Sequence, residues 1–222
     1  MQQDIEKVSK YYDSFLASEP GKYSSLAEFT ARYEPIISFL ENKRGELKVL
    51  DIGCGTGMAS EKLKRFGKVY GIDISPKSIE QAAQRLDEAK VGIAEDIAYP
   101  NEVFDAVVCT ETLEHVLKPQ LAIREFYRVL RAKGNLLIST PNPWNWRIVL
   151  TGLYAKTHKK QTNTGQIIEH YLSPPQLKQL LQSNGFIIEE YRTVFFRPQF
   201  IKWLPIAGLY QVCIATKRKE RI

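Results

Sequence analysis

The sequence predicts an α/β protein built on a doubly wound, mostly parallel sheet. The first observation is a short apolar run, residues 49–52, that passes directly into a turn with three glycines. The second is a regular alternation of apolar strands and amphipathic helices after this turn, which favours a parallel sheet with helices on both faces. The third is the loss of this rhythm after residue 141, where about 30 residues show little periodicity.

Two amphipathic helices are expected before the first strand. Apolar side chains recur with helical spacing over residues 4–17 and again over residues 25–40, and Pro35 should kink the second helix. Packing or solvation is the commonest role of large polar side chains on such helices. Three of them are also candidates for ligand contact: Tyr11, Tyr12 and Arg32.

The turn after Ile52 is suited to a ligand. Gly53, Gly55 and Gly57 alternate over five residues, and glycine both accepts positive φ and lets a ligand approach the main chain. A helix is expected over residues 58–66, with its free N–H groups directed at the contents of the turn. The third glycine comes one residue too early for the dinucleotide-binding pattern G-x-G-x-x-G.

The rest of the chain alternates between strands and helices. The expected strands span residues 68–73, 91–94, 104–110, 135–140, 186–194 and 209–216. The expected helices start at the Ser75-Pro76, Lys118-Pro119 and Ser173-Pro174 pairs, because proline suits the first helical position, and end near Gly134 and Gly185 in the second and third cases. The basic tail, residues 217–221, is expected to fray.

The second strand ends in an acidic residue, Asp73, which lies 18 residues beyond Gly55. A carboxylate at that position can accept hydrogen bonds from both ribose hydroxyls of an adenine nucleoside. An acidic residue at a strand end can also simply form a turn. The apolar strand before Asp73 and its spacing from the glycines favour the ligand role.

These features resemble, in chain order, the four cofactor motifs of the class I S-adenosylmethionine-dependent methyltransferases. The motifs are carried by residues 49–57, 73, 95–97 and 104–116. The later stretches, including His170, are most similar to small-molecule enzymes such as the O-methyltransferases of ubiquinone biosynthesis. The resemblance implies a Rossmann-like sheet of seven strands with strand seven antiparallel, and S-adenosyl-L-methionine across the carboxyl ends of the first four strands.

The resemblance also implies a set of cofactor-binding residues. In the family, an acidic residue after strand three bonds the adenine amino group and its neighbour packs on the ring, positions that Asp96 and Ile97 match. The full set of expected cofactor contacts is Asp51, Gly53, Cys54, Gly55, Gly57, Asp73, Ile74, Asp96, Ile97 and Thr110.

A hydroxyl acceptor must lose a proton, either to a base or with the help of a metal ion. His115 and His170 are the candidate catalytic bases, although a histidine that only bonds locally is equally compatible with the sequence. If a helix starts after Thr110, then Glu111, Glu114 and His115 share one face and could hold a divalent ion such as Mg²⁺ or Zn²⁺. Carboxylates in a first helical turn are also favoured by the helix dipole without any metal.

Methyl transfer to a hydroxyl of a small-molecule acceptor is the leading functional hypothesis. An RNA or protein methyltransferase and a noncatalytic S-adenosylmethionine-binding module are the alternatives. The net charge of +6 fits an acidic partner but falls short of a nucleic-acid signature. The Asn/Asp-Pro-Pro-Tyr/Phe motif of nucleic-acid amino-methyltransferases is missing after the fourth strand.

Residues 203–215, together with the basic tail, have two interpretations: a peripheral membrane contact, or a strand in the core of the protein, which is favoured.

At 222 residues and 44% hydrophobic, the chain should form one domain. We expect a helical cap at 1–45, a cofactor-binding core at 46–141, a mobile substrate-side insertion at 142–172 and a C-terminal part at 173–222. The polar start lacks a signal-peptide pattern and the three cysteines lack metal-site spacing, which is typical of a reduced cytoplasmic protein.

Overall fold

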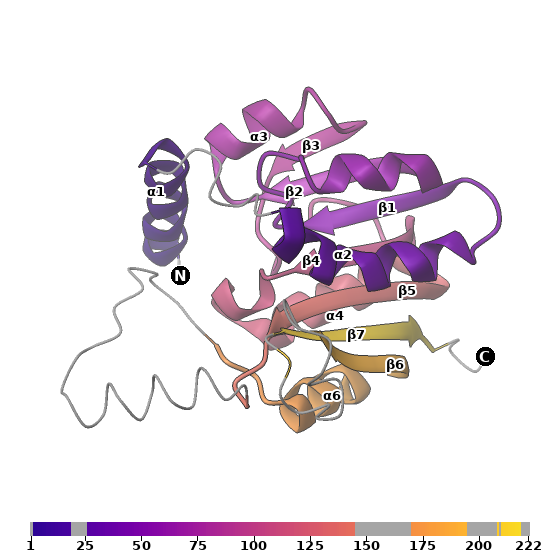
Figure 1. The fold of residues 1–222 in the computed structure, drawn as a ribbon. Coiled ribbons are helices and arrows are strands. Elements are labelled where there is room, and N and C mark those ends of the chain that lie inside the picture. The colour runs from indigo at the N-terminus through magenta and orange to yellow at the C-terminus, as the bar shows by residue number, and fades with distance from the viewer. Residues whose placement is uncertain (1, 19–25, 145–169, 195–207, 209, 219–222) are drawn as a thin grey trace, which may run out of the picture.

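The computed structural model describes residues 2–18, 26–144, 170–194, 208 and 210–218, and is built on one seven-stranded sheet (Figure 1). The strands are β1 (Leu47–Ile52), β2 (Gly67–Asp73), β3 (Glu88–Val91), β4 (Phe104–Thr110), β5 (Leu130–Pro141), β6 (Phe186–Val194) and β7 (Tyr210–Lys217). The helices are α1 (Gln2–Ser18), α2 (Leu26–Glu41), α3 (Pro76–Ala82), α4 (Pro119–Val129) and α6 (Pro174–Ser183), with 3-10 turns η2 (Ser60–Phe66) and η3 (Leu113–His115).

The strand order β3-β2-β1-β4-β5-β7-β6 is that of a doubly wound sheet. Strands β1 to β5 are mutually parallel, whereas β7 lies antiparallel between β5 and β6. The order reverses between β1 and β4, and open sheets of this kind bind ligands beyond the carboxyl ends of the strands at such a point. The predicted Rossmann-like sheet with an antiparallel seventh strand is confirmed.

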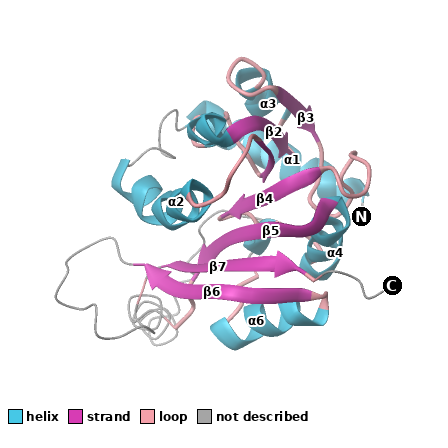
Figure 2. Cartoon of the chain, turned by 90° about the vertical axis from the view of Figure 1, so that its right-hand side faces the viewer, coloured by secondary structure: helices cyan, strands magenta, loops and turns pink. Residues whose placement is uncertain are grey.

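Helices cover both faces of the sheet, as Figure 2 shows for α2 on one side and α4 on the other. One buried cluster joins α4 and α6 to the sheet through residues such as Phe126, Leu177 and Leu136. The other joins α2, η2 and α3 to the opposite face through Ile36, Leu63 and neighbouring side chains. Because α2 contributes fully buried residues to this second core, it is an integral layer of the fold.

The bounds predicted from the alternation of apolar and polar residues are wrong for three elements. The helix expected over 58–66 is a 3-10 turn that starts at Ser60, whose hydroxyl is committed to a buried hydrogen bond with Asp51. The third strand is Glu88–Val91 instead of 91–94, because it is paired through residues that are only partly buried. The helix before β5 ends at Val129, far from Gly134, because Leu130 already pairs with β4.

The basic tail does not fray at its first residue. Lys217 is 5% exposed, and its ammonium donates a hydrogen bond to the carbonyl oxygen of Leu130 at 2.8 Å and pairs with Glu102 at 3.1 Å. In the described part of the chain, no helix combines the length and apolarity needed to cross a membrane. Most of the insertion lies outside the described residues, as do residues 203–207 and 209 of the segment 203–215, whereas residues 210–215 belong to β7.

Candidate functional site

The glycine turn after β1 has the positive φ angles that its sequence predicts. Gly53, Gly55 and Gly57 have φ angles of +73°, +53° and +78°. A Cβ on Gly53 would lie 2.1 Å from the hydroxyl oxygen of Thr112, so only glycine fits where the loop after β4 crosses the turn. The N–H of Gly53 donates to the carbonyl oxygen of Ile72 at 2.7 Å, which fastens the turn to β2.

Asp73, at the end of β2, is held by the turn beside it. Its Oδ2 accepts the N–H of Gly55 at 2.8 Å and its Oδ1 accepts the N–H of Ser75 at 2.9 Å. Burial raises the pKa of Asp73 above its ordinary value, and these two N–H donors oppose the rise. Each carboxylate oxygen keeps a lone pair for a further donor, as recognition of a vicinal diol requires.

The first helix is attached next to this carboxylate. The hydroxyl of Ser75 donates to Asp13 Oδ1 at 2.5 Å, and the hydroxyl of Ser9 donates to the carbonyl oxygen of Ile74 at 2.9 Å. Ser75 is also the predicted N-cap of α3, where its side chain accepts the N–H of Ser78. These bonds hold α1 at the carboxyl ends of the parallel strands, which point toward it in Figure 1.

Asp51, in β1, does not line the cavity that lies beyond the carboxyl ends of β1 to β4. It is fully buried, and its Oδ2 accepts the hydroxyls of Ser60 at 2.5 Å and Tyr33 at 3.4 Å. Its Oδ1 is buried with no hydrogen-bond partner among the described residues. Burial raises the pKa of Asp51 to about 7, although the two hydroxyls lower it. Gly57, at the end of the turn, is also buried and does not line the cavity; a Cβ there would lie 3.1 Å from the Cα of Ala82.

Replacement of Asp51 by asparagine should therefore stabilise the ligand-free protein at alkaline pH. Between about pH 4 and pH 7, the folded protein keeps a proton on Asp51 that the unfolded chain has lost. The stability that this bound proton contributes is therefore lost as pH rises through about 7. We expect Asp51→Asn to raise the free energy of unfolding by about 1–3 kcal/mol at pH 8 and by less at pH 5. Urea unfolding at both pH values would measure it.

The matched control is Asp105→Asn, because Asp105 lies outside the cavity and is partly exposed beside Arg131. The change at Asp105 removes an ion pair and should lower stability by a similar amount at both pH values. A variant at Asp51 that loses stability equally at pH 5 and pH 8 would contradict a raised pKa at this carboxyl.

The loop after β3 reaches the cavity earlier than the sequence suggested. Asp96 is exposed and Ile97 is 2% exposed in the core, and neither residue lines the cavity. Because β3 ends at Val91, the lining comes from residues 92–95. The backbone turns between Ile93 and Asp96, which form an isolated bridge and direct the side chain of Asp96 into solvent.

The end of β4 forms the other side of the cavity. Thr110 lines it and donates its hydroxyl to Tyr33 at 3.0 Å. The next residue, Glu111, has a φ of +51° and accepts the hydroxyl of Ser139 at 2.9 Å. Its second carboxylate oxygen lies 3.9 Å from the Arg32 guanidinium. A left-handed residue at 111 cannot start a helix, so the helix expected after Thr110 is wrong.

His115 follows in the short turn η3 and lines the cavity. Its Nε2 lies 3.8 Å from Oε1 of Glu114, a carboxylate that is 2% exposed. His170 also sits near this turn, because its backbone N–H donates to the carbonyl oxygen of Glu114 at 2.7 Å, but its side chain is exposed and does not line the cavity. Of the two histidines, the structure brings only His115 to the cavity.

The metal hypothesis is not confirmed. It required Glu111, Glu114 and His115 on one helical face, and the turn at Glu111 removes that arrangement. Across the residues that the structure describes, no group of three His, Cys, Asp or Glu side chains is placed to hold a metal ion.

Cys54 lines the cavity with its thiol buried, and burial raises the pKa of that thiol, so it stays protonated.

One cavity of about 810 Å³ connects these groups. Strand order places its parts in sequence along the sheet: residues 92–95 after β3, Asp73 after β2, the glycine turn after β1, and His115 after β4. Side chains from α1 and aromatic residues close to β5 and β7 complete the walls: Ile5, Val8, Tyr12, Tyr171 and Tyr210. The guanidinium carbon of Arg32 lies 5.1 Å from the centroid of the Tyr210 ring. Arg32 lines the same end of the cavity as His115.

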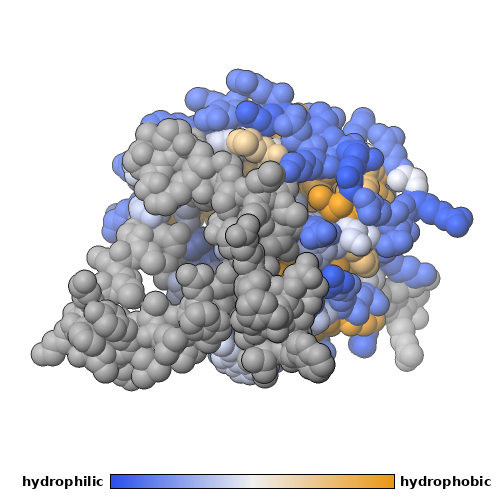
Figure 3. Space-filling model, in the orientation of Figure 1, coloured by the Kyte–Doolittle hydropathy of each residue, from blue (hydrophilic) through white to orange (hydrophobic). Residues whose placement is uncertain are grey.

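The described surface of the molecule is mixed in character. In the view of Figure 3, hydrophilic residues cover most of the described surface and apolar groups show between them. Met58 and Tyr171, which both line the cavity, are 55% and 45% exposed. The sequence identified Tyr12 and Arg32 as candidates; Tyr210 carried no local signal, because only the antiparallel pairing of β7 with Pro141 brings it here.

Residues 50–138 match the family model described as a methyltransferase domain. The chain is 31% identical over 179 residues to the ubiquinone biosynthesis O-methyltransferase of Bradyrhizobium diazoefficiens, an alignment that covers 73% of this chain and 67% of that protein. It is also 31% identical over 167 residues to the mitochondrial enzyme of the same description from Bos taurus, covering 68% of this chain. The chain spans less than half, 44%, of that longer relative.

Among solved structures, the fold is similar to an S-adenosylmethionine-dependent methyltransferase from Thermotoga maritima. The TM-score is 0.70, and the match covers 95% of this chain and 100% of that one. Sequence identity is 20%, so this likeness concerns the fold alone. It extends beyond the residues of the family model to the N-terminal helices and the last strands.

Proposed function

This chain belongs to the class I S-adenosylmethionine-dependent methyltransferases, and we propose that it transfers a methyl group from this cofactor to a hydroxyl of a small-molecule acceptor. The observation that carries the proposal is the continuous cavity that holds Asp73 at one end and His115 at the other. A volume of about 810 Å³ is in the range of small-molecule sites. Its cover by α1 favours a small acceptor over a polymer.

The residues present fit the cofactor. The two oxygens of Asp73 can each accept one ribose hydroxyl while they keep their bonds to Gly55 and Ser75. The backbone at Gly55 is open, because a Cβ there would meet no atom within 4 Å, and this leaves room for the polar end of the ligand. Residues 92–95 would then face the base. S-adenosylmethionine supplies an activated methyl group on a positively charged sulfur.

At the other end, the chain has groups that can prepare a hydroxyl. We assign to His115 the removal of the acceptor proton, since its imidazole lines the cavity next to the end of β4. The proton moves from the acceptor oxygen to a ring nitrogen, and the buried carboxylate of Glu114, 3.8 Å away, stabilises the resulting imidazolium. The aromatic walls at Tyr12 and Tyr210 orient a planar acceptor and exclude water.

The similarity to ubiquinone biosynthesis O-methyltransferases supports a phenolic or catechol-type acceptor. The test is transfer of a labelled methyl group from S-adenosylmethionine to a panel of phenols and catechols. We expect a methyl ether as product, identified by mass spectrometry. Aliphatic amines and nucleosides in the same panel serve as controls for attack by nitrogen.

Two outcomes would contradict the proposal. Label transferred to RNA or to protein, with binding that weakens steeply as salt rises, would instead support a polymer-modifying enzyme. Cofactor binding without transfer to any member of the panel or of a metabolite extract would instead support a noncatalytic binding module.

A further inference from the structure

The loop that follows β3 is attached to the beginning of α4. The carboxylate of Glu95 accepts the backbone N–H of Lys118 at 3.0 Å. Lys118 is the N-cap residue of α4, and its own side chain makes no capping hydrogen bond. Glu95 therefore caps the helix from a distant loop, where a negative charge is also favoured by the helix dipole. This bond ties a residue of the cavity wall to α4.

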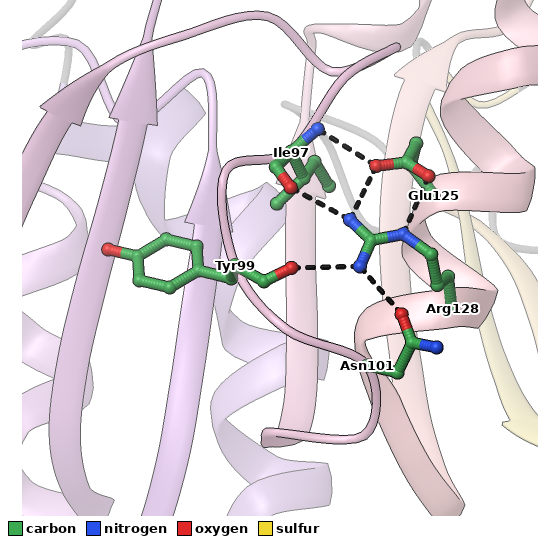
Figure 4. Close-up of polar contacts among 5 residues, drawn as sticks. All are labelled: Ile97, Tyr99, Asn101, Glu125 and Arg128. Carbon is green, nitrogen blue, oxygen red and sulfur yellow. Dashed lines mark hydrogen bonds and ion pairs between the residues drawn. The ribbon is translucent and has the colours of Figure 1, made fainter.

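The same loop is attached to the last turn of α4 by its backbone (Figure 4). The Arg128 guanidinium donates to the carbonyl oxygens of Ile97 and Tyr99 at 2.7 and 2.8 Å and to the side chain of Asn101 at 2.9 Å. Glu125 accepts the N–H of Ile97 at 2.9 Å and pairs with Arg128 through two hydrogen bonds of 2.7 Å. The planar fork of arginine suits several acceptors at once.

Glu125 and Arg128 form a partly buried ion pair. The side chains of Arg128 and Glu125 are 30% and 19% exposed. Burial would raise the pKa of Glu125, but the hydrogen bonds from Arg128 and Ile97 bring it below its ordinary value, so both groups stay charged at neutral pH. The pair satisfies backbone groups in a segment that forms no strand, which fixes the course of the loop.

The clamped segment and the cavity wall are consecutive in the chain. Residues 92–95 line the cavity, whereas residues 97–101, which the pair holds, lie behind them. Since β3 is the neighbour of β2 on the side away from β4, this wall lies beyond Asp73 as seen from His115. A nucleoside with its ribose on Asp73 and its reactive end near β4 places its base against residues 92–95.

We propose that Glu125 and Arg128 are positioning residues for the base of the bound nucleoside. Neither side chain lines the cavity; they act through the loop backbone, which they hold in the form that residues 92–95 need for binding. This preorganisation removes the need to order the wall when the ligand binds. The inference rests on the proposed function, because it requires the cofactor to occupy this cavity.

The test is calorimetric titration of the protein with S-adenosylhomocysteine, the demethylated product. Arg128→Met should weaken binding about tenfold, the effect of having to order roughly one backbone residue on binding. The affinity of Arg128→Lys should lie between those of wild type and Arg128→Met, because a lysine ammonium cannot bond all the acceptors that the guanidinium reaches. The matched control is Arg131→Met, which removes the 2.8 Å ion pair with Asp105 outside the cavity and should leave affinity within about twofold of wild type.

Hydrogen exchange separates positioning from general stabilisation. In Arg128→Met we expect faster exchange at residues 93–99 without ligand, recovery of protection when the product is bound, and unchanged exchange in β1 and β4. Wild-type affinity in a folded variant with a lower melting temperature would overturn the inference, as would weaker binding with unchanged exchange at 93–99. If Arg128→Met does not fold, Arg128→Lys carries the same comparison. No binding by wild type would contradict the proposed function itself.

Discussion

Replacement of Asp73 by alanine should lower the affinity for S-adenosylmethionine or its demethylated product by at least about 100-fold. Each carboxylate oxygen is expected to accept one ribose hydroxyl, and a hydrogen bond to a charged acceptor contributes roughly 1.5–3 kcal/mol. Two such bonds account for a loss of at least 100-fold, since each factor of ten corresponds to about 1.4 kcal/mol. The change also releases the N–H groups of Gly55 and Ser75, which adds to the loss.

Calorimetry of the folded variant measures this effect, and Asp87→Ala is its control. Asp87 accepts the backbone N–H of Val69 at 2.9 Å, so it supports β2 in the way that Asp73 supports the turn, but it does not line the cavity. We expect Asp87→Ala to cost stability and to leave affinity unchanged. Equal affinities for wild type and Asp73→Ala would contradict the assignment of Asp73 to the ribose.

Strands β4 and β6 begin and end at the predicted residues, and β2 begins one residue earlier than predicted. Strand β4 is central and almost entirely buried, whereas β6 is an edge strand whose residues are mostly partly buried or exposed. Central parallel strands are recognisable because they are continuous apolar runs bounded by turn residues. The edge strand β3 gave a weaker signal, because its residues are partly buried or exposed, and the apolar residues of 91–94 placed the prediction three residues too late.

The boundary between α4 and β5 could not be placed from local pattern. Gly134 looked like a helix end, but it lies inside β5, where a Cβ would approach the carbonyl oxygens of Arg131 and Asp105. The strand begins at Leu130 because it pairs there with Phe104, and a register shift follows. Pairing between residues so distant in the chain decides the boundary, and no local propensity encodes it.

The same contrast applies to the cavity. The glycine turn and Asp73 were predictable because they follow one another along a single strand–turn–strand unit. The attachment of Asp13 to Ser75 and the position of Tyr210 depend on contacts between residues far apart in the chain, so they had no local signal. Glu111 shows the opposite case: its spacing fitted a helix, but a left-handed backbone stabilised by Ser139 prevailed.

Replacement of His115 by glutamine should lower kcat by about 10²–10⁴-fold, the contribution of a positioned general base. Glutamine retains a polar group of similar size in the cavity wall but cannot take the acceptor proton at neutral pH. The KM for the cofactor should stay close to wild type, because Asp73 and the glycine turn lie on other strands. Both constants are measured by steady-state transfer of a labelled methyl group to the acceptor that the panel identifies, and single-turnover transfer then isolates the chemical step.

The matched control is His170→Gln, which changes a histidine that is close to Glu114 through its backbone but has an exposed side chain. We expect this variant to keep the wild-type rate. A loss of rate in His170→Gln but not in His115→Gln would reverse the assignment of the base. If both variants keep the wild-type rate, proximity and exclusion of water are sufficient for transfer, because an acceptor hydroxyl that is acidic enough ionises without a protein base.

The pH profile tests the same assignment independently of the variants' absolute rates. If His115 is the base, the wild-type rate rises with pH as the imidazole loses its proton, and this limb disappears in His115→Gln. The effect should depend on Glu114, because a carboxylate 3.8 Å from the imidazole stabilises its charged form. Glu114→Gln should therefore shift the limb to lower pH, whereas a purely structural Glu114 would leave its position unchanged.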